Sequence, residues 1–475
     1  MKAEVYPLPS AFNLLPSGEL IAFVGGGGKT SLMFALAGAL TARGQRVVTT
    51  TTTRIFAAQM KLAPAVLTTE DTEGTETERL DQPLAQFGSC LVVGRVEGEK
   101  ALGVPADLPA RLLARPDVDH VLVEADGSQM RPIKAPADHE PVIPPETTLL
   151  VPVVGIDALD GPIREVAHRP ELVMRLLNSQ QLTVNPSMPQ DQQLTVGSGQ
   201  YEVTERLSVG AVACLLTHPE GGLKNAPDGT RVIPLINKVE TATQLVAARQ
   251  IAGHALHAAR IAQVVIGAVK SEQPVHEVHR RVTAVVLAAG ESRRMGKQTK
   301  QLLPWGETTV LGQTLHNLKQ TMIHDILVVS GHEAKAVEAI ATAENVDAIR
   351  NTQYASGEML SSLQTAIRHL PPNRAAVLVV LADQPMVEPE TMERLLEAYW
   401  QGQGELIAPI HDGRRGNPVL IGRAYFDELL ALPPGAAPRD VLKKHRDELC
   451  LVSVESDSVL RDLDRPEEYE RWRPS

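Results

Sequence analysis

Strand-like apolar runs alternate with helix-like stretches in both halves of the chain, which predicts an α/β protein. One amphipathic run, 32–40, follows the apolar run 20–24 and the glycine-rich string 25–31, and it predicts a helix. In the first half, strands are predicted at Leu20–Val24, Arg46–Thr50, Cys90–Val93, His120–Glu124, Thr148–Val153, Arg231–Ile236 and Ile261–Ile266. In the second half, they are predicted at Val282–Leu287, Ile326–Val329, Ala376–Leu381, Leu406–Ala408 and Leu451–Val454.

Two polar stretches interrupt this pattern. The segment Ser271–Arg280 separates the two series of strands, and we interpret it as a linker between an N-terminal domain at 1–275 and a C-terminal domain at 281–475. A chain of 475 residues is too long for one ordinary core, so two domains fit its length. The segment 177–206 is rich in Gln, Ser, Thr and Pro and predicts a flexible surface insertion.

Composition narrows the choice of partners and compartment. The hydrophobic content of 43% is typical of a globular protein, and the net charge of −11 argues against a nucleic-acid coat or an anionic membrane as partner. The cysteines Cys90, Cys214 and Cys450 are far apart, and the first two lie in or beside apolar runs that predict buried thiols. The N-terminus has no long apolar signal region and no run reaches membrane-spanning length, so we expect a cytoplasmic enzyme.

The richest chemistry follows the predicted strand Val282–Leu287. A small-residue turn comes first, and its glycine lets the backbone approach a ligand closely. Two arginines and a lysine then follow, and such cations are suited to surround a triphosphate, because arginine binds phosphate through a planar fork and lysine as a point charge. The candidate nucleotide-binding residues are Leu287, Ala288, Ala289 and Gly290, and the candidate catalytic cations are Arg293 and Lys300.

The string L-A-A-G-E-S-R-R-M-G at 287–296 and K-Q-L-L-P-W at 300–305 resemble the nucleotidyltransferases that attach a nucleotide to molybdopterin. The details are most similar to the molybdenum cofactor cytidylyltransferase (MocA-like) branch. This resemblance covers residues 281–475 and implies a Rossmann-like nucleotidyltransferase domain. Three residues separate Gly296 from Lys300 where the family usually has two. We assign the family's lysine to Lys300 because Q-L-L-P-W follows it, and Lys297 is the alternative.

Carboxylates that could hold Mg²⁺ occur in two further segments. Nucleotidyl transfer builds charge on phosphate oxygens, which a metal ion and cations stabilise. The strand Ala376–Leu381 runs into L-A-D-Q-P, where the resemblance makes Asp383 a Mg²⁺ ligand. The string D-L-D-R-P-E at 462–467 resembles the family segment that brings a second carboxylate to the metal. We favour Asp464 slightly over Asp462 as that ligand, and a helix cap is the alternative for both.

Further matches bear on the substrates. Ser361 and Ser362 lie in a G-x-x-x-S-S-L segment, where they are expected to open a helix and contact the base or ribose. Asn417 stands where the family has a histidine, which puts a proton or metal role there in doubt. The turn Ala-Ala-Gly favours CTP, because the guanylyl branch usually shows Ala-Gly-Gly; a single small residue decides such specificity by fit alone.

We therefore expect a Mg²⁺-dependent nucleotidyltransferase of the EC 2.7.7 class that transfers CMP from CTP to the molybdenum cofactor and releases pyrophosphate. Two alternatives stay open. The enzyme class could hold with another acceptor, such as a sugar phosphate or another pterin, or with GTP as the donor. The protein could instead be a nucleotide-switched carrier or chaperone that binds cofactor without turning it over.

The first half carries its own candidate phosphate site. The apolar run 20–24 leads into G-G-G-G-K-T-S at 25–31, and a strand, a glycine loop and a helix start together make an anion site. Lys29 is expected to reach the phosphates and Thr30 to hold Mg²⁺. Phe23 stands where a full Walker A string has its first glycine, so a plain glycine turn is the alternative. The loop glycines are Gly25, Gly26, Gly27 and Gly28.

Three other strings add to this site. The run His120–Glu124 continues into Ala125 and Asp126 as a Walker B element does, and Asp126 is a candidate metal ligand, with an acidic strand end as the alternative. The string N-K-V-E at 237–240 resembles the N-K-x-D base-reading motif of GTP-binding proteins, although a helix cap explains it about as well. The threonine run 49–53 either places hydroxyls near Mg²⁺ or is a β-prone strand end.

Together with V-E-A-D-G-S at 123–128 and K-A-P-A-D-H-E-P-V-I-P at 134–144, these strings resemble the selenium-dependent hydroxylase accessory proteins (YqeC-like). The string H-P-E-G-G-L-K at 218–224 adds to the match, which covers residues 12–270. The resemblance implies a P-loop-like accessory module that binds ATP or GTP, with a molybdenum hydroxylase apoenzyme as the recipient partner. The residues Lys134, Asp138, His139 and Glu140 are expected to line the same cleft, or to form a solvated turn.

Overall fold

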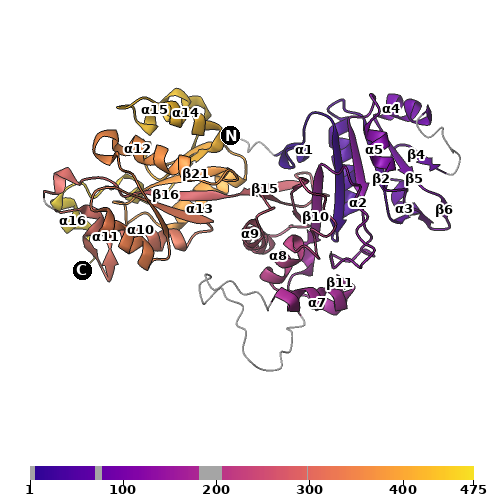
Figure 1. Ribbon diagram of the computed structural model, residues 1–475, viewed down its shortest axis with the longest axis horizontal. Coiled ribbons are helices and arrows are strands. Elements are labelled where there is room, and N and C mark those ends of the chain that lie inside the picture. Colours follow the sequence, from indigo (N-terminus) through magenta and orange to yellow (C-terminus); the bar gives the residue numbers. More distant parts are fainter. Residues whose placement is uncertain (1–5, 70–77, 181–205, 297, 475) are drawn as a thin grey trace, which may run out of the picture. The chain divides into compact units, whose positions relative to one another are not determined.

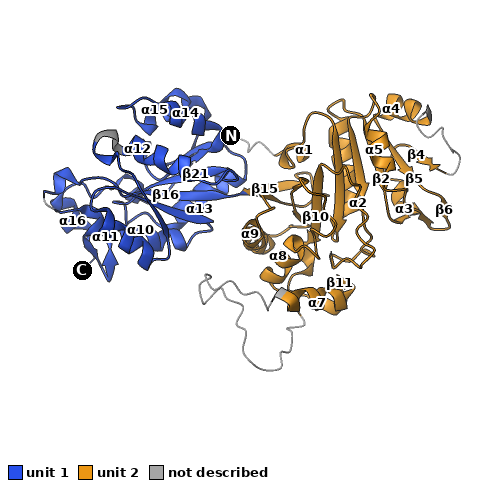
Figure 2. Ribbon diagram, in the orientation of Figure 1, with its two compact units in different colours: residues 1–4, 280–475 blue, residues 5–279 orange. Residues whose placement is uncertain are grey.

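The computed structural model describes residues 6–69, 78–180, 206–296 and 298–474. Figure 2 shows its two compact units, residues 5–279 and residues 280–475. Each unit is built on a large sheet with helices packed against it (Figure 1). Within the described part of the chain, no helix combines the length and the apolar character that crossing a membrane requires.

The sheet of residues 5–279 has ten strands in the order β15-β14-β13-β10-β1-β8-β2-β5-β4, with β12 beside β10. The paired strands from β14 to β4 run parallel, so their carboxyl ends lie along one edge. The strands are β1 (Glu19–Gly25), β2 (Val47–Thr51), β4 (Val66–Thr68), β5 (Ser89–Val93), β8 (His120–Glu124), β10 (Leu149–Gly155), β12 (Arg231–Val232), β13 (Leu235–Asn237), β14 (Gln263–Gly267) and β15 (Val275–Arg280).

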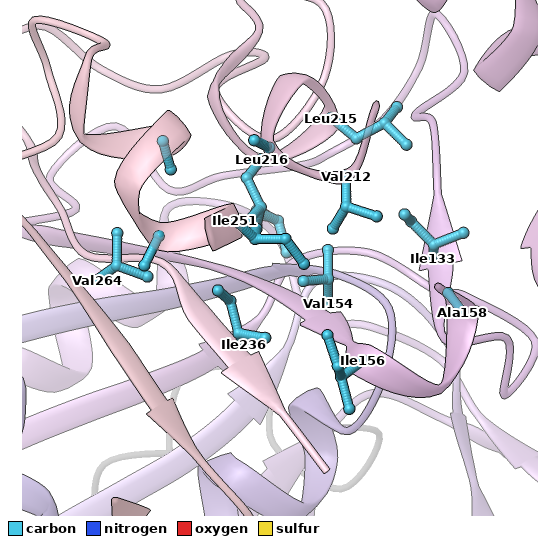
Figure 3. Close-up of a cluster of buried hydrophobic side chains, with 14 of the residues drawn as sticks. Ile133, Val154, Ile156, Ala158, Val212, Leu215, Leu216, Ile236, Ile251 and Val264 are labelled. Carbon is cyan, nitrogen blue, oxygen red and sulfur yellow. The ribbon is translucent and has the colours of Figure 1, made fainter. Parts of the chain in front are cut away.

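Helices cover both faces of this sheet, which explains why its strands read as continuous apolar runs. Along β1, Ala22 and Val24 pack into one core cluster, and Ile21 and Phe23 pack into another on the opposite face. Figure 3 shows the first cluster, in which Val212 and Leu216 of one helix and Ile251 of the next lie over Val154 and Ile236. The helices are α1 (Leu8–Ala11), α2 (Lys29–Thr41), α3 (Ala57–Met60), α4 (Asp81–Phe87), α5 (Leu108–Leu113), α6 (Ile163–Val166), α7 (Pro170–Gln180), α8 (Val209–Thr217) and α9 (Ala242–Leu256).

Two small sheets complete this unit. One joins β3 (Ile55–Phe56), β7 (Lys100–Ala101) and β6 (Val96–Glu97), and the other pairs β9 (Ile133–Lys134) with β11 (Ala167–His168). The second of these brings Lys134 and His168 into register.

The structure differs from the sequence-based expectations at three places in this unit. The expected linker Ser271–Arg280 is wrong in its second half, because Val275–Arg280 forms β15; its two buried valines were hidden among histidines and charges. The expected strand Arg231–Ile236 is split into β12 and β13, since Pro234 has no amide to donate to a neighbouring strand. The expected insertion at 177–206 begins within α7, and its residues 181–205 lie outside the described residues.

The sheet of residues 280–475 is mixed. Its order is β20-β19-β16-β21-β24-β22-β23 with β25 beside β22, and β16 runs parallel to both β19 and β21. The expected strands Val282–Leu287 and Ala376–Leu381 coincide with β16 and β21. The strands are β16, β19 (Asp325–Ser330), β20 (Asp347–Arg350), β21, β22 (Leu406–His411), β23 (Arg414–Arg415), β24 (Val419–Gly422) and β25 (Leu449–Ser453). A separate hairpin pairs β17 (Pro304–Trp305) with β18 (Thr308–Thr309).

Helices again pack on both faces. Ala284 and Val286 of β16 belong to one core cluster, and Val285 belongs to the other. The central strands β16 and β21 thus end between two covered faces, which fixes the positions of the residues that follow them. The helices are α10 (Val310–Lys319), α11 (Ala334–Ala343), α12 (Tyr354–His369), α13 (Pro389–Trp400), α14 (Phe426–Ala431), α15 (Pro438–Lys444) and α16 (Pro466–Trp472).

Candidate functional site

The turn after β16 is fixed by its neighbour β19. The amide of Ala288 donates to the carbonyl of Val329, and the carbonyl of Ala289 accepts from the amide of His332. A Cβ on Gly331 would lie 2.7 Å from the Cβ of Ala289, so the two loops touch at a position that only glycine fits. Gly290 is exposed beyond this contact, at the point where the sequence places the nucleotide.

Lys300 is the centre of the C-terminal site. Its ammonium nitrogen forms an ion pair with Asp383, after β21, and another with Asp464, whose Oδ1 lies 2.8 Å away. The lysine side chain is only 14% exposed. Burial opposes its charge, but the two carboxylates outweigh burial and raise its pKa. Three segments far apart in the sequence therefore meet around one buried cation.

A third carboxylate lies beside this cluster. Gln384 donates through Nε2 to Oδ1 of Asp462 at 2.6 Å. Burial, reinforced by the charge of Asp383, raises the pKa of Asp462 to about 6. Neither Asp462 nor Asp464 caps α16, since that helix begins at Pro466 after the N-cap Arg465. The helix-cap alternative for these two aspartates is therefore wrong.

The structure brings Arg294, and not Arg293, to these carboxylates. An NH1 nitrogen of Arg294 lies 2.6 Å from Asp464 Oδ2. Arg293 pairs instead with Glu291 and has a side chain that is 77% exposed. The spacing of L-A-A-G-x-S-x-R-M-G already places its arginine at position 294, so the signal was present in the sequence.

Ser361 and Ser362 do not open a helix. They lie in the middle of α12, buried, and both hydroxyls accept from Nδ2 of Asn351, at 2.8 and 3.0 Å. Asn351 follows β20, a strand that the apolar pattern did not reveal because its residues Asp347–Arg350 are mostly exposed. Lys297, the alternative to Lys300, lies outside the described residues.

The C-terminal carboxylates fit a magnesium ion. Mg²⁺ prefers oxygen ligands and is usually held by one or two carboxylates together with substrate phosphates. Asp383 and Asp464 supply two such carboxylates, and they already enclose a cation, the ammonium group of Lys300. Among the described residues, no three His, Cys, Asp or Glu side chains converge as a metal site.

In the N-terminal unit, the glycine loop lies between β1 and α2, and each glycine is required by close packing. An added Cβ would lie 2.4 Å from Val153 O at Gly25, 2.6 Å from Arg131 O at Gly26, and 2.1 Å from Gly155 N at Gly27. Added to Gly28, it would lie 2.5 Å from Nδ2 of Asn237. The loop is therefore pressed against the ends of neighbouring strands.

Three of the four glycine amides donate to protein oxygens. Gly25 donates to the carboxylate of Asp126 at 3.0 Å, Gly26 to the carbonyl of Val153 and Gly27 to the carbonyl of Arg131. The amides of residues 28–31, at the start of α2, have no acceptor among the described residues. An anion would consequently meet the first turn of α2 and not the whole glycine loop.

Lys29 and Thr30 are buried against the end of β8. The lysine nitrogen lies 3.2 Å from Asp126 Oδ1 and 3.9 Å from Glu124 Oε1. The hydroxyl of Thr30 donates to Glu124 Oε2 at 2.7 Å, so Thr30 contacts Glu124 and not Asp126, its expected co-ligand. Burial raises the pKa of Glu124. The sequence pattern alone does not single out Glu124 as a site residue.

The expected cleft residues separate into two groups. Lys134 is buried, 3.1 Å from Asp126 and 2.7 Å from Glu140, and Arg169 also pairs with Glu140 at 2.5 Å. Burial opposes the charge of Glu140, but hydrogen bonds from Arg169 and Lys134 lower its pKa to about 2. Asp138 and His139 are exposed at the rim of this network: Asp138 lies 4.0 Å from Lys224, and Nε2 of His139 lies 4.0 Å from Oε1 of Glu140. Lys134 and Glu140 thus extend the site from Asp126 towards α7.

The hydroxyls of the threonine run face the sheet. Those of Thr49, Thr50, Thr51 and Thr52 donate to backbone carbonyls of neighbouring segments. Four hydroxyls of the run are therefore engaged in structural hydrogen bonds, which favours its interpretation as a strand end.

Comparison with known proteins gives one match to each unit. The family model "YqeC protein" matches residues 21–171, and the model "MobA-like NTP transferase domain" matches residues 284–449. The chain is 32% identical to the uncharacterized protein YqeC of Escherichia coli over 220 residues, which are 46% of this chain and 75% of that protein.

Two further relatives match the C-terminal unit. The chain is 26% identical to the molybdenum cofactor cytidylyltransferase of Escherichia coli, over 40% of this chain and 93% of that protein. It is 29% identical to nicotine blue oxidoreductase of Paenarthrobacter nicotinovorans, over 40% of this chain and 95% of that protein.

Proposed function

The chain belongs to the YqeC family through its N-terminal unit and carries a MobA-like nucleotidyltransferase domain in its C-terminal unit, and from this we propose a two-part enzyme of molybdenum cofactor maturation. The C-terminal unit transfers CMP from CTP to the molybdenum cofactor and releases pyrophosphate. The N-terminal unit is a P-loop-like module that binds ATP or GTP and serves delivery of the product to a molybdenum hydroxylase apoenzyme.

The observation that carries the first part is the cluster around Lys300. Its two ion-pair partners lie 83 and 164 residues farther along the chain, so the fold brings distant segments together to form it. Burying a lysine between two aspartates costs desolvation energy, which argues that this cluster is retained for a function. Transfer of a nucleotidyl group needs such an arrangement, because charge develops on the phosphate oxygens as pyrophosphate leaves.

Each residue then has a defined task. Lys300 and Arg294 bind the triphosphate, and they exchange their present carboxylate partners for phosphate oxygens. Asp383 and Asp464 hold Mg²⁺, which supplies charge stabilisation for the leaving pyrophosphate. The protein backbone of residues 287–290 lies against the nucleotide. Arg293 stays a candidate for a more distant phosphate contact.

The donor base and the acceptor follow from finer features. The Ala288–Ala289 pair favours the smaller cytosine base, as the turn of the cytidylyltransferase branch does. The relative from Escherichia coli is by name a molybdenum cofactor cytidylyltransferase, which supports the same acceptor here. The oxidoreductase relative matches the same share of this chain, 40%, but a Lys–Asp–Asp cluster is suited to phosphate chemistry and not to hydride or electron transfer.

The test is pyrophosphate release from the full chain with molybdenum cofactor and Mg²⁺, comparing CTP, GTP and ATP. Asp383→Ala should abolish release. Asp447→Ala, at an exposed aspartate of the same unit, should leave it unchanged. Release with GTP alone would mean that the donor is GTP and not CTP. If active cofactor gave no release with any of the three nucleotides, the transfer reaction would be refuted.

The N-terminal part of the proposal rests on the amides of residues 28–31 together with the lysine beside them. Phosphate at the start of α2 would meet these amides and the Lys29 ammonium, with Thr30, Glu124 and Asp126 near the accompanying metal ion. Lys29→Ala should remove nucleotide binding by this unit, measured by calorimetry on the full chain. Equal binding by the wild type and this variant would refute a nucleotide site here.

A further inference from the structure

Two loops at the carboxyl edge of the N-terminal sheet are joined to the glycine loop by one buried side chain. Asn237, which ends β13 and is 4% exposed, donates through Nδ2 to the carbonyl of Gly27 at 2.8 Å. Its Oδ1 accepts from the amide of Val269, in the loop after β14, at 3.0 Å. The same amide side chain therefore holds the loop after β13, the loop after β14 and the glycine loop in one arrangement.

The order of strands places these loops where the base of a bound nucleotide would lie. β13 is two positions from β1, with β10 between them, and all three strands are parallel. Neighbouring strands are about 5 Å apart, so the ends of β1 and β13 are about 10 Å apart. A nucleotide with its phosphates at the start of α2 spans this interval towards the residues after β13.

One of those residues, Glu240, has an unengaged carboxylate. It is exposed, and it has no hydrogen-bond or ion-pair partner among the residues that the structure describes. The helix-cap explanation does not apply to it, because α9 is capped by Thr241, whose hydroxyl accepts from the amide of Gln244 at 3.2 Å. Glu240 is therefore not needed to begin the helix.

Asn237 and Lys238, at the start of the same loop, restrict the position of Glu240. Lys238 has a positive φ of 66°, which is uncommon for a residue with a side chain, and it pairs with Asp157 of the loop after β10 at 2.7 Å. The loop is thus anchored at Asn237 and again at Lys238, which positions Glu240 beyond a short fixed turn.

From these contacts we propose that the N-terminal site binds a guanine nucleotide, whose base is recognised by the carboxylate of Glu240 on the loop that Asn237 fastens to the glycine loop. This inference rests on the nucleotide site proposed above and names its base. An ionised carboxylate only accepts hydrogen bonds, through two oxygens. Guanine presents two adjacent donors, N1–H and the N2 amino group, whereas adenine presents an acceptor at N1.

The experiment is calorimetric binding of Mg²⁺ complexes of GTP, ATP and xanthosine triphosphate to the full chain. The part of each signal that Lys29→Ala removes is assigned to the N-terminal site, because the C-terminal unit can also bind nucleotides. At the N-terminal site, we expect GTP to bind at least roughly tenfold more tightly than ATP.

A variant pair tests the carboxylate itself. Glu240→Gln should weaken GTP binding by roughly ten- to a hundredfold and strengthen binding of xanthosine triphosphate. The base xanthine carries a carbonyl oxygen where guanine has its amino group, and a carboxamide can donate to that oxygen while accepting from N1–H. Glu146→Gln, at an exposed glutamate near the start of β10, is the matched control and should change neither affinity.

The outcomes separate the two proposals. If Lys29→Ala removes no binding of any nucleotide, the N-terminal nucleotide site is refuted and this inference with it. If Lys29-dependent binding is equal for GTP and ATP, or if Glu240→Gln leaves GTP affinity unchanged, only the guanine assignment is overturned. The comparison of GTP with ATP needs only the wild type and Lys29→Ala, so it tests the guanine assignment even where Glu240→Gln fails to fold.

Discussion

Replacing the two adjacent arginines one at a time discriminates between two assignments of the catalytic cation. Arg294 contacts Asp464 at 2.6 Å, whereas Arg293 contacts the neighbouring Glu291 at 2.8 Å. Both side chains are more than two-thirds exposed, at 72% and 77%, so each ion pair contributes less than about 1 kcal/mol to folding. Neither Arg294→Ala nor Arg293→Ala should therefore unfold the protein, and differences in activity can be attributed to the reaction.

The magnitude follows from the contact that each arginine can make in the transition state. A charged hydrogen bond that forms as the phosphate oxygens gain charge contributes about 1.5–3 kcal/mol, which is roughly 10- to 150-fold in kcat/KM. We expect Arg294→Ala to lose that factor and Arg293→Ala to stay within about fivefold of the wild type. Arg294→Lys should recover only part of the loss, since lysine lacks the planar fork.

The assay is kcat/KM for CTP in pyrophosphate release at saturating molybdenum cofactor. A tenfold or larger loss in Arg293→Ala, with near wild-type activity in Arg294→Ala, would refute the geometric assignment. Equal losses in both variants would mean that the whole basic turn acts as one unit and that the contact with Asp464 does not distinguish its members.

Three further predictions concern the N-terminal unit. Gly27→Ala should strongly destabilise the unit in thermal unfolding, because Gly27 has φ 72° and the new Cβ would lie 2.1 Å from a backbone nitrogen. Gly38→Ala, in open space on α2, should instead raise stability by up to about 1 kcal/mol. Similar effects of the two variants would contradict the packing argument. Glu277 is buried, which opposes its charge, but hydrogen bonds from His279 and Arg249 lower its pKa from 4.5 to about 2. The stabilisation that comes from this lowered pKa is present above pH 4.5 and is lost as the pH falls towards 2. In urea unfolding, the free energy of unfolding of the wild type should therefore fall by about 3 kcal/mol over that window, whereas that of Glu277→Gln should not show this loss. Burial raises the pKa of Cys90 to about 12, so a thiol reagent at neutral pH should leave Cys90 unmodified in the folded protein, and its rapid labelling would disprove the buried state.

The strands at the centre of each sheet could be predicted from the sequence because they are buried on both faces. β8, β16 and β21 match the expected ranges residue for residue, since each is a mainly apolar run with at most one polar residue in its interior. The edge strands could not be found in this way. β20 is largely exposed and β15 alternates valines with histidines and charges, so neither shows the apolar run that identifies a central strand.

The site residues divide along similar lines. Lys300, Asp383 and Asp464 could be selected because each lies in its own recognisable string, and the structure brings the three together. Glu124 was missed as the partner of Thr30 because the string V-E-A-D offers two carboxylates and nothing local decides between them. Only the packing of α2 against the end of β8 places the Thr30 hydroxyl against Glu124 and leaves Asp126 to the lysines.

The glycine loop shows most clearly what a local pattern leaves undetermined. Four successive glycines indicate a backbone that approaches something closely, but the pattern is silent on whether the neighbour is a phosphate or the protein. Here the added Cβ atoms would meet protein atoms at all four positions, and three of the amides donate inward. The glycines therefore bring the start of α2 close to β10, β13 and the 131–133 segment, and the proposed phosphate site is left with the first amides of α2 and the ammonium of Lys29. A consequence is that a mutation of Gly28 acts through its contact with Asn237, which also holds the loop of Glu240, so it should alter the choice of base together with the affinity for phosphate.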